Sequence, residues 1–349
     1  MGMGQLVWFV VFACIGIAVY TRASWMPKVL GGSRFQSNVG RIGGVEAATF
    51  EGEISLGQPT NFFNRLGMTR EGQWDRRLFL AEELGPKIQE GFTNAWAQSM
   101  PDSPGLQLVI GFRKIDEAWN ARGYGRASNV TDDAHARMHQ CGQLAAQAFS
   151  RAAATDPADP VPWIGLIRAE HCIQHDDVKQ RARAHFAEVM RRDPESVDGI
   201  MALGSVLAPH WFGEDGEFLA EARGLAQGAP PGSWRAYAII HAHLNEWHKR
   251  KAFKSMPEGM AYITSPQVIG ELRAAYAASL GHPSFRQPTG ALKMLNTAAF
   301  VLYLAGQKDI VRHELARIAG RYTDVWERMP GAKDEHAGFA AVSHWAATA

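Results

Sequence analysis

Segments 145–157 (AAQAFSRAAATDP) and 182–194 (ARAHFAEVMRRDP) carry the same pattern of small, aromatic and Asp-Pro positions. In each segment an alanine is followed four residues later by a phenylalanine, and the segment ends in an Asp-Pro step. The aspartates of the two steps, Asp156 and Asp193, lie 37 residues apart. A self-match at a fixed spacing is typical of repeat architectures, in which each helix pair packs on the next.

Helical periodicity extends over most of the chain. From Gln73 onward, apolar residues recur at steps of three and four, and strand patterns are nearly absent after Phe62. This periodicity is typical of amphipathic helices, so we predict an all-α fold of stacked antiparallel helix pairs. The predicted helices cover residues 106–121, 132–155, 163–174, 178–192, 196–207, 214–228, 233–250, 291–305 and 308–323, with an irregular stretch over 255–290 and a tail from Gly331 that caps the stack.

The repeated segments resemble tetratricopeptide repeats. Trp163 and Leu166 match the tryptophan and leucine of the first helix of such a repeat. The loop over 172–177 is about three residues too long for that family, and the pattern fades beyond Pro194. The resemblance implies a tetratricopeptide-like α-solenoid, whose stacked hairpins form a curved surface that binds other proteins.

A second resemblance covers about residues 74–250. It rests on four strings in consistent order: 117–123 (EAWNARG), 156–163 (DPADPVPW), the run from Trp211 to Ser233, and 241–247 (HAHLNEW). Together they are similar to a group of bacterial helical domains of unknown function. This resemblance implies an α-helical, repeat-like domain and carries no known chemistry.

Composition and motifs exclude several classes of function. The 349 residues have a formal net charge of +1, so no basic excess predicts nucleic-acid binding. Cys14, Cys141 and Cys172 form neither a disulfide framework nor a zinc motif. The sequence holds no phosphate-binding loop, nucleophile elbow or Cys-x-x-Cys pair, so it predicts no catalysis and no small-molecule cofactor.

The N-terminus contains an uncharged apolar run over residues 6–20 (LVWFVVFACIGIAVY). A helix of that length spans only ~22 Å of a ~30 Å hydrocarbon core, but flanking apolar residues extend it if Arg22 snorkels to the interface. We predict a membrane anchor. A cleaved signal peptide ending near Ala23 and an ordinary buried helix are the alternatives.

The charges after the apolar run predict the topology. Four basic residues follow the run and no acidic residue precedes Glu46, so the positive-inside rule places the body in the cytoplasm; they are Arg22, Lys28, Arg34 and Arg41. We therefore expect a single-pass membrane protein with an anchor over 1–26, a linker and irregular segment over 27–72, and a helical-repeat domain over 73–349.

One set of polar residues is compatible with a metal site. His171 and His175 are four residues apart, a spacing that puts two imidazoles on one helical face. His241 and Glu246 could complete a four-ligand site if their helix meets the first. A metal-dependent hydrolase is therefore the rival to a binding protein. Helix capping and structural packing are the alternative explanations of these histidines.

The preferred hypothesis is a membrane-tethered helical-repeat protein that binds another protein or a peptide. Stacked hairpins create an extended concave surface used for recognition. We predict that four residues line this surface: Trp163, Arg181, Trp211 and His243. A subunit that only packs against copies of itself is a third hypothesis.

Overall fold

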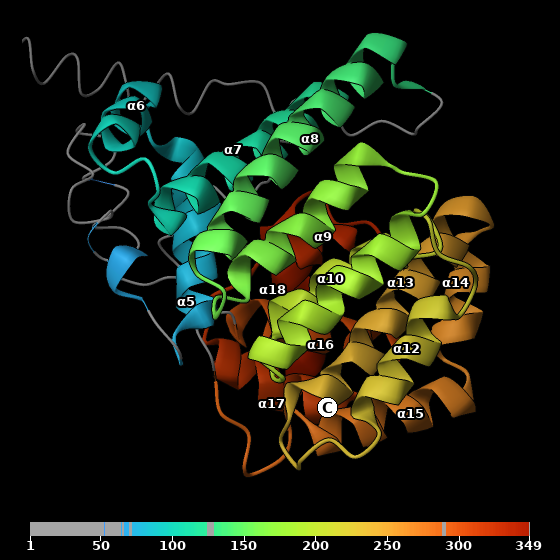
Figure 1. Ribbon diagram of the computed structural model, residues 1–349. Coiled ribbons are helices and arrows are strands. Elements are labelled where there is room, and N and C mark those ends of the chain that lie inside the picture. The colour runs from blue at the N-terminus through green and yellow to red at the C-terminus, as the bar shows by residue number, and fades with distance from the viewer. Residues whose placement is uncertain are drawn as a thin grey trace, which may run out of the picture.

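The computed structural model describes residues 72–123, 129–287 and 291–348, together with residues 52, 64 and 66–69. Every regular element in this part of the chain is a helix, which confirms the all-α class (Figure 1). In chain order the elements are α5 (Trp74–Phe79), the π-helical η2 (Leu80–Leu84), the 3-10 helix η3 (Gly85–Lys87), α6 (Glu90–Ser99), α7 (Pro104–Arg122), α8 (Asp132–Thr155), α9 (Val161–Ile173), α10 (Val178–Arg192), α11 (Val197–Val206), α12 (Glu217–Ala226), the 3-10 helix η5 (Trp234–Ala236), α13 (Tyr237–Phe253), α14 (Met256–Ile263), α15 (Pro266–Ala278), α16 (Ala291–Leu304), α17 (Lys308–Ile318), the 3-10 helix η6 (Asp324–Arg328) and α18 (Glu335–Ala347).

The helices pack in two layers. In the first layer, α7 contacts α9, α9 contacts α11, α11 contacts α13, and α13 contacts α16. The second layer consists of α8, α10, α12, α15 and α17. Of these, α8, α10, α12 and α17 each pack on a first-layer helix next to them in the chain, whereas α15 packs on α13, from which α14 separates it in sequence.

Phe149 explains why the repeated pattern combines an aromatic with small residues. Its side chain is fully buried on α8 between α7 and α9. A Cβ atom added at Gly111 of α7 would lie 2.4 Å from the Phe149 ring, and one added at Gly165 of α9 would lie 2.5 Å from it. The ring thus fills space that two glycines leave open, and this close packing fixes α8 against both neighbours.

The two Asp-Pro steps are structurally equivalent. Asp156 ends α8 with φ −127° and ψ 83°, and Asp193 ends α10 with φ −139° and ψ 86°. Each following proline carbonyl accepts a hydrogen bond from an arginine one repeat further on. Arg192 Nε donates to Pro157 O at 2.7 Å, and Arg235 Nε donates to Pro194 O at 3.0 Å.

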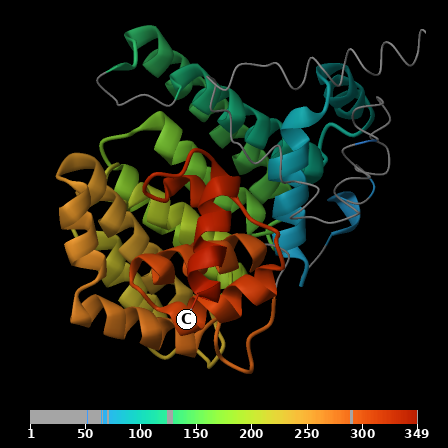
Figure 2. The same cartoon turned by 180° about the vertical axis from the view of Figure 1, so that it is seen from behind.

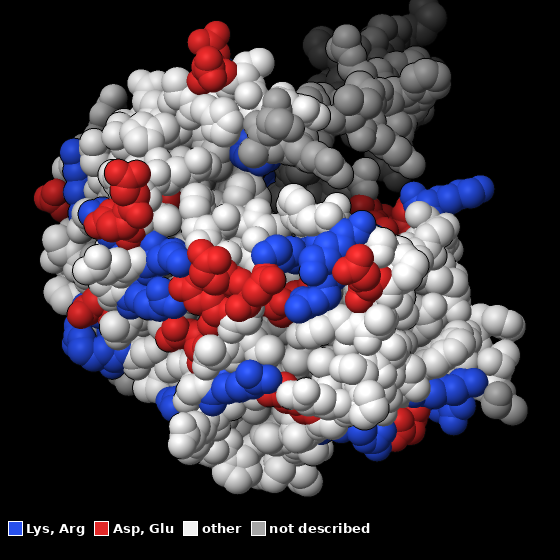
Figure 3. All heavy atoms as spheres, turned by 90° about the vertical axis from the view of Figure 1, so that its right-hand side faces the viewer, with Lys and Arg blue, Asp and Glu red and all other residues white. Residues whose placement is uncertain are grey.

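Long charged side chains connect the second-layer helices. Ion pairs join α10 to α12, α12 to α15, and α15 to α17. Each pair places a basic side chain of one helix beside an acidic side chain of the next. On the face shown in Figure 3, acidic and basic side chains accordingly alternate and do not gather into areas of one sign. The pairs are Arg183–Glu217 at 2.9 Å, Arg223–Glu271 at 2.6 Å and Arg273–Asp309 at 3.3 Å.

The C-terminal helices cover one side of this array. Helices α16 to α18 lie behind α9 and α10 in Figure 1 and in front of the green helices in Figure 2. Trp326 of η6 is fully buried, and its indole donates to Asn296 Oδ1 of α16 at 2.6 Å. Helix α18 packs on α17 and η6, with Val342 fully buried, so the tail caps the stack as predicted.

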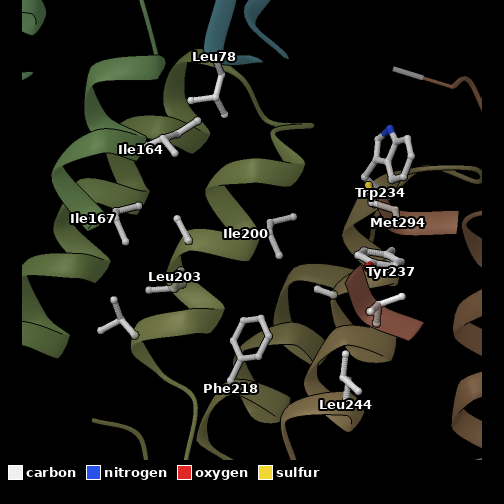
Figure 4. Packing of buried hydrophobic residues seen from close by; sticks show 14 of the residues in the cluster. Leu78, Ile164, Ile167, Ile200, Leu203, Phe218, Trp234, Tyr237, Leu244 and Met294 are labelled. Atoms are coloured by element: carbon white, nitrogen blue, oxygen red, sulfur yellow. The ribbon is translucent and has the colours of Figure 1, made fainter. Parts of the chain in front are cut away.

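A single hydrophobic cluster runs through the layers (Figure 4). It begins at Leu66 and ends at Ala346, and it includes Ile167 of α9, Phe218 of α12 and Met294 of α16. The described helices therefore share one core, with no second cluster that would mark a separate domain.

The prediction of an irregular stretch over 255–290 is wrong for most of its length. Helices α14 and α15 occupy residues 256–263 and 266–278. Pro257 lies in the first turn of α14, and Pro266 is the first residue of α15. Proline is favoured in a first turn because the N–H it lacks would have no partner inside the helix there. These prolines begin helices and do not interrupt them.

The predicted anchor over 1–26 lies outside the described residues, as does nearly all of the predicted linker over 27–72. Among the residues that the structure describes, no helix has the length and apolar character needed to cross a membrane.

Candidate functional site

Arg181 of α10 pairs with one buried carboxylate, that of Glu170 on α9. Trp163, also on α9, is connected to this carboxylate only through His185. The Arg181 guanidinium donates to Glu170 Oε1 from Nε at 2.8 Å, and its Nη2 lies 2.7 Å away. His185 Nε2 lies 3.5 Å from the same oxygen, and the His185 ring centroid is 5.9 Å from that of Trp163.

The charge of Glu170 is compensated locally. Burial raises its pKa, but hydrogen bonds from His185 and Arg181 lower it, and the resulting pKa is below the ordinary value. Glu170 is therefore ionised at neutral pH and holds α10 against α9. Its partner Arg181 remains exposed, so a ligand can reach the guanidinium only beside this ion pair.

His243 is itself buried and belongs to a different network, whose other members are half-buried or exposed. Its Nδ1 lies 2.7 Å from Tyr262 Oη, and its Nε2 lies 3.1 Å from Glu271 Oε2. Arg223 donates to both carboxylate oxygens of Glu271, at 2.6 and 2.8 Å. The imidazole joins α13 to α14 and α15, and both of its nitrogens are occupied, so this network stabilises the stack.

Trp211 lies in a cluster of aromatic rings at the C-terminal ends of the first-layer helices. Its centroid is 4.4 Å from that of His171 and 5.6 Å from that of Trp119. The Arg122 guanidinium lies over the Trp211 ring, 5.0 Å from its centroid. Next to it, the His210 and His248 rings are 4.9 Å apart. His210 also acts electrostatically on His241, which packs on Phe218. We call His171, His210, His241 and His248 the histidine cluster.

The members of the histidine cluster are neutral at pH 7. Burial is the main cause, and it lowers the pKa of His171 and His241 to about 3. Burial likewise lowers the pKa of His210 and His248 to about 4. Nearby basic groups and His210 itself lower these pKa values further.

The structure corrects the basis of the predicted metal site. His171 and His175 do not share a helical face, because α9 ends at Ile173 and Gln174 adopts a left-handed conformation with φ 60°. His175 instead lies beside Glu170, with Nε2 3.9 Å from Oε2.

The other two predicted ligands, Glu246 and His241, have contacts of their own. Glu246 Oε1 accepts a hydrogen bond from the Gly216 backbone N–H at 2.7 Å, and Glu246 Oε2 accepts one from Arg250 at 2.6 Å. His241 packs at 6.0 Å, between ring centroids, from Phe218. In the described ranges, no group of three or more His, Cys, Asp or Glu side chains has the arrangement to hold a metal ion.

A set of charged residues that the sequence analysis missed meets on the first layer. An ion pair joins Arg168 of α9 to Glu82 of η2. Glu83 interacts electrostatically with Lys293 of α16, Asp198 of α11 and Asp324 of η6. All of these side chains are half-buried. We call the six residues the inner charged site: Glu82, Glu83, Arg168, Asp198, Lys293 and Asp324.

The environment of this site changes the proton affinity of its charged groups. Burial raises the pKa of Glu83, while Lys293 and Lys87 lower it less. Burial lowers the pKa of Arg168, and Asp198 opposes that shift. A signal for the site was present in the sequence: Arg168 and Lys293 each interrupt an apolar helix with a cationic side chain.

A cavity of about 510 Å³ lies near the start of α7, where Ser103, Pro104 and Gly105 contribute to its wall. No residue predicted from the sequence as a site residue lines it. Arg77, also in its wall, donates through Nε to Asp159 Oδ2 at 2.6 Å and is therefore engaged in the fold.

Comparisons with known proteins supply no further assignment. No protein family, no curated protein and no solved structure matches the chain. The two resemblances noted from the sequence stay predictions, and the function must be argued from the residues themselves.

Proposed function

We propose that this chain is a membrane-tethered helical-repeat protein that binds a segment of another protein at the inner charged site. The observation that carries the proposal is the convergence of six charged, half-buried side chains from η2, α9, α11, α16 and η6. These elements are separated by up to some 240 residues of sequence (Glu82 to Asp324) and meet only in the folded stack.

The burial of these charges argues for a function beyond folding. Charged side chains lose hydration when they are buried, and apolar residues of similar size would stabilise a core at least as well. Lys293 lies on a helix whose other described positions are almost all buried and apolar. Charges at such positions fit a surface that presents paired donors and acceptors to a polar partner.

The mixture of signs suggests the type of partner. Glu82, Glu83, Asp198 and Asp324 are acidic, whereas Arg168 and Lys293 are basic. A peptide segment that carries both signs matches this arrangement better than a polyanion does. A nucleic acid is therefore not the proposed partner.

Two features support the remaining parts of the proposal. The equivalent Asp-Pro ends of α8 and α10 favour a tetratricopeptide-like solenoid, whose first-layer helices line the binding surface. The uncharged run over 6–20 and the basic residues after it favour a membrane tether with the body in the cytoplasm.

The test is affinity capture from solubilised membranes with the full chain and two matched variants. Lys293→Gln removes a charge from the inner charged site, and Lys333→Gln removes one from an exposed position. We expect a partner that the parent and Lys333→Gln capture equally and that Lys293→Gln captures at least about fivefold less, as for loss of a charged contact. Circular dichroism checks that all three chains are equally folded. Equal capture by both variants would refute the proposed surface.

A further inference from the structure

The histidine cluster is not part of the inner charged site, at which we propose that a protein binds. Its four members come from α9, from the turn after α11 and from α13. The His171 ring is 4.4 Å from Trp211 and 5.4 Å from Phe212, between centroids. The His210 ring is 4.9 Å from His248.

Each member has one buried ring nitrogen without a hydrogen-bond partner. These atoms are His171 Nε2, His210 Nδ1, His241 Nδ1 and His248 Nδ1. The side chain of His171 is 4% exposed. Buried polar atoms in folded proteins are almost always bonded to protein, water or a ligand, so these four ring nitrogens are available to hydrogen-bond a polar ligand.

The charges around the cluster are predominantly basic. The positive charge of Arg122 lowers the pKa of His171, and that of Arg328 lowers the pKa of His210, His241 and His248. Three lysines each lower the pKa of one member: Lys249 that of His210, Lys251 that of His248 and Lys293 that of His241. Among nearby acidic residues, Asp215 is paired with Lys249 and Glu327 precedes Arg328 in the chain. None of these carboxylates is among the charges that act on the four imidazoles.

Part of this basic charge has a structural role. Arg122 is the last residue of α7 and Lys251 lies in the last turn of α13, where cations offset the partial negative charge of a helix end. Arg328 ends the short helix η6, is exposed, and acts on three of the four histidines. Its place at the end of η6 also suits a cation, but its action on three imidazoles of other elements is additional to that role.

We propose that the histidine cluster, together with Arg328, binds an oxyanion such as a phosphate or carboxylate group. Imidazole N–H groups donate to the anion oxygens, and the surrounding basic side chains supply the opposite charge. The tryptophan and phenylalanine rings limit the access of water, which strengthens these bonds. A cation would meet the same basic side chains, and the cluster lacks metal-binding geometry among the described residues.

Isothermal titration of the full chain with sulfate, inorganic phosphate and acetate tests the proposal. The variants are His210→Ala and Arg328→Gln, and the exposed Arg286→Gln and His313→Ala are the matched controls. We expect saturable binding of at least one of these anions, weakened about tenfold by either cluster variant, as for loss of a charge-assisted hydrogen bond. Neither control should change it. Because Arg328 is exposed, its substitution tests the site even if His210→Ala does not fold.

The choice among the anions identifies the ligand class. Binding of phosphate and sulfate without acetate indicates a tetrahedral oxyanion, and binding of acetate as well indicates recognition of carboxylates; both outcomes support the site. Absence of saturable binding at millimolar anion, binding unchanged by Arg328→Gln, or titration by zinc chloride in place of the anions would overturn it. Capture of a protein partner is a separate measurement, so the two proposals fail independently.

Discussion

At the scale of single residues, the buried pair Arg77–Asp159 shows how a polar contact fixes the N-terminal part of the stack. Both side chains are almost fully buried, and Arg77 Nε lies 2.6 Å from Asp159 Oδ2. Arg77 Nη1 also donates to the Leu66 carbonyl at 2.6 Å. The second Asp159 oxygen accepts from the Val161 N–H at 2.8 Å, at the start of α9. One aspartate therefore links α5 to α9.

Substitution of Arg77 by methionine tests this link. The change leaves Asp159 buried without its cation, so we expect a loss of about 3–5 kcal/mol in the free energy of unfolding. Urea denaturation followed by circular dichroism measures it. The double variant Arg77→Met/Asp159→Asn should recover part of the loss, because no uncompensated charge remains buried. A single variant within about 0.5 kcal/mol of the parent, the range of ordinary surface changes, would contradict this role.

At the scale of helices, the contacts between layers depend on glycine opposite a large side chain. Phe149 meets Gly111 on α7 and Gly165 on α9, and it lies 4.9 Å, between ring centroids, from Phe112 in an edge-to-face arrangement. Such packing excludes even one added methyl group unless a ring or a helix moves.

A pair of glycine substitutions separates packing from helix propensity. Gly111→Ala should destabilise the protein by about 1–3 kcal/mol, because its Cβ would overlap the Phe149 ring. Gly270→Ala, within α15, meets no atom within 4 Å and should be neutral or stabilise by up to about 1 kcal/mol. Thermal unfolding of both variants measures the difference. Similar melting temperatures for the two would show that α7 and α8 are not closely packed at Phe149.

Local signals explain which helices the sequence predicts well. Helix α8 begins and ends where expected, because the Thr131 side chain accepts from the Ala134 N–H and Asp156-Pro157 stops the helix. Helix α10 agrees equally well. The prolines of α14 and α15 were interpreted as helix breaks. The sequence alone does not distinguish a proline that begins a helix from one that interrupts it. Residues 1–50 lie outside the described part, so the anchor remains a prediction.

At the scale of the whole molecule, the candidate sites form only when distant helices pack. The four residues predicted to line one surface belong to three separate clusters, because sequence spacing does not specify which neighbour a side chain faces. The inner charged site combines η2 near the N-terminal end of the stack with α16 and η6 near its C-terminal end. Cationic residues in apolar helices mark two of its members, Arg168 and Lys293, but the convergence of all six depends on how the C-terminal helices cover the first layer.

Site-specific photo-cross-linking in membranes tests the central claim, that a partner binds at the inner charged site, most directly. Benzoylphenylalanine is introduced into the full chain at position 198 or 293, and at the exposed positions 286 and 333 as controls. The account predicts adducts with another protein from positions 198 and 293, and few or none from the controls. Adducts from 286 and 333 alone, or from no position in correctly folded protein, would contradict it.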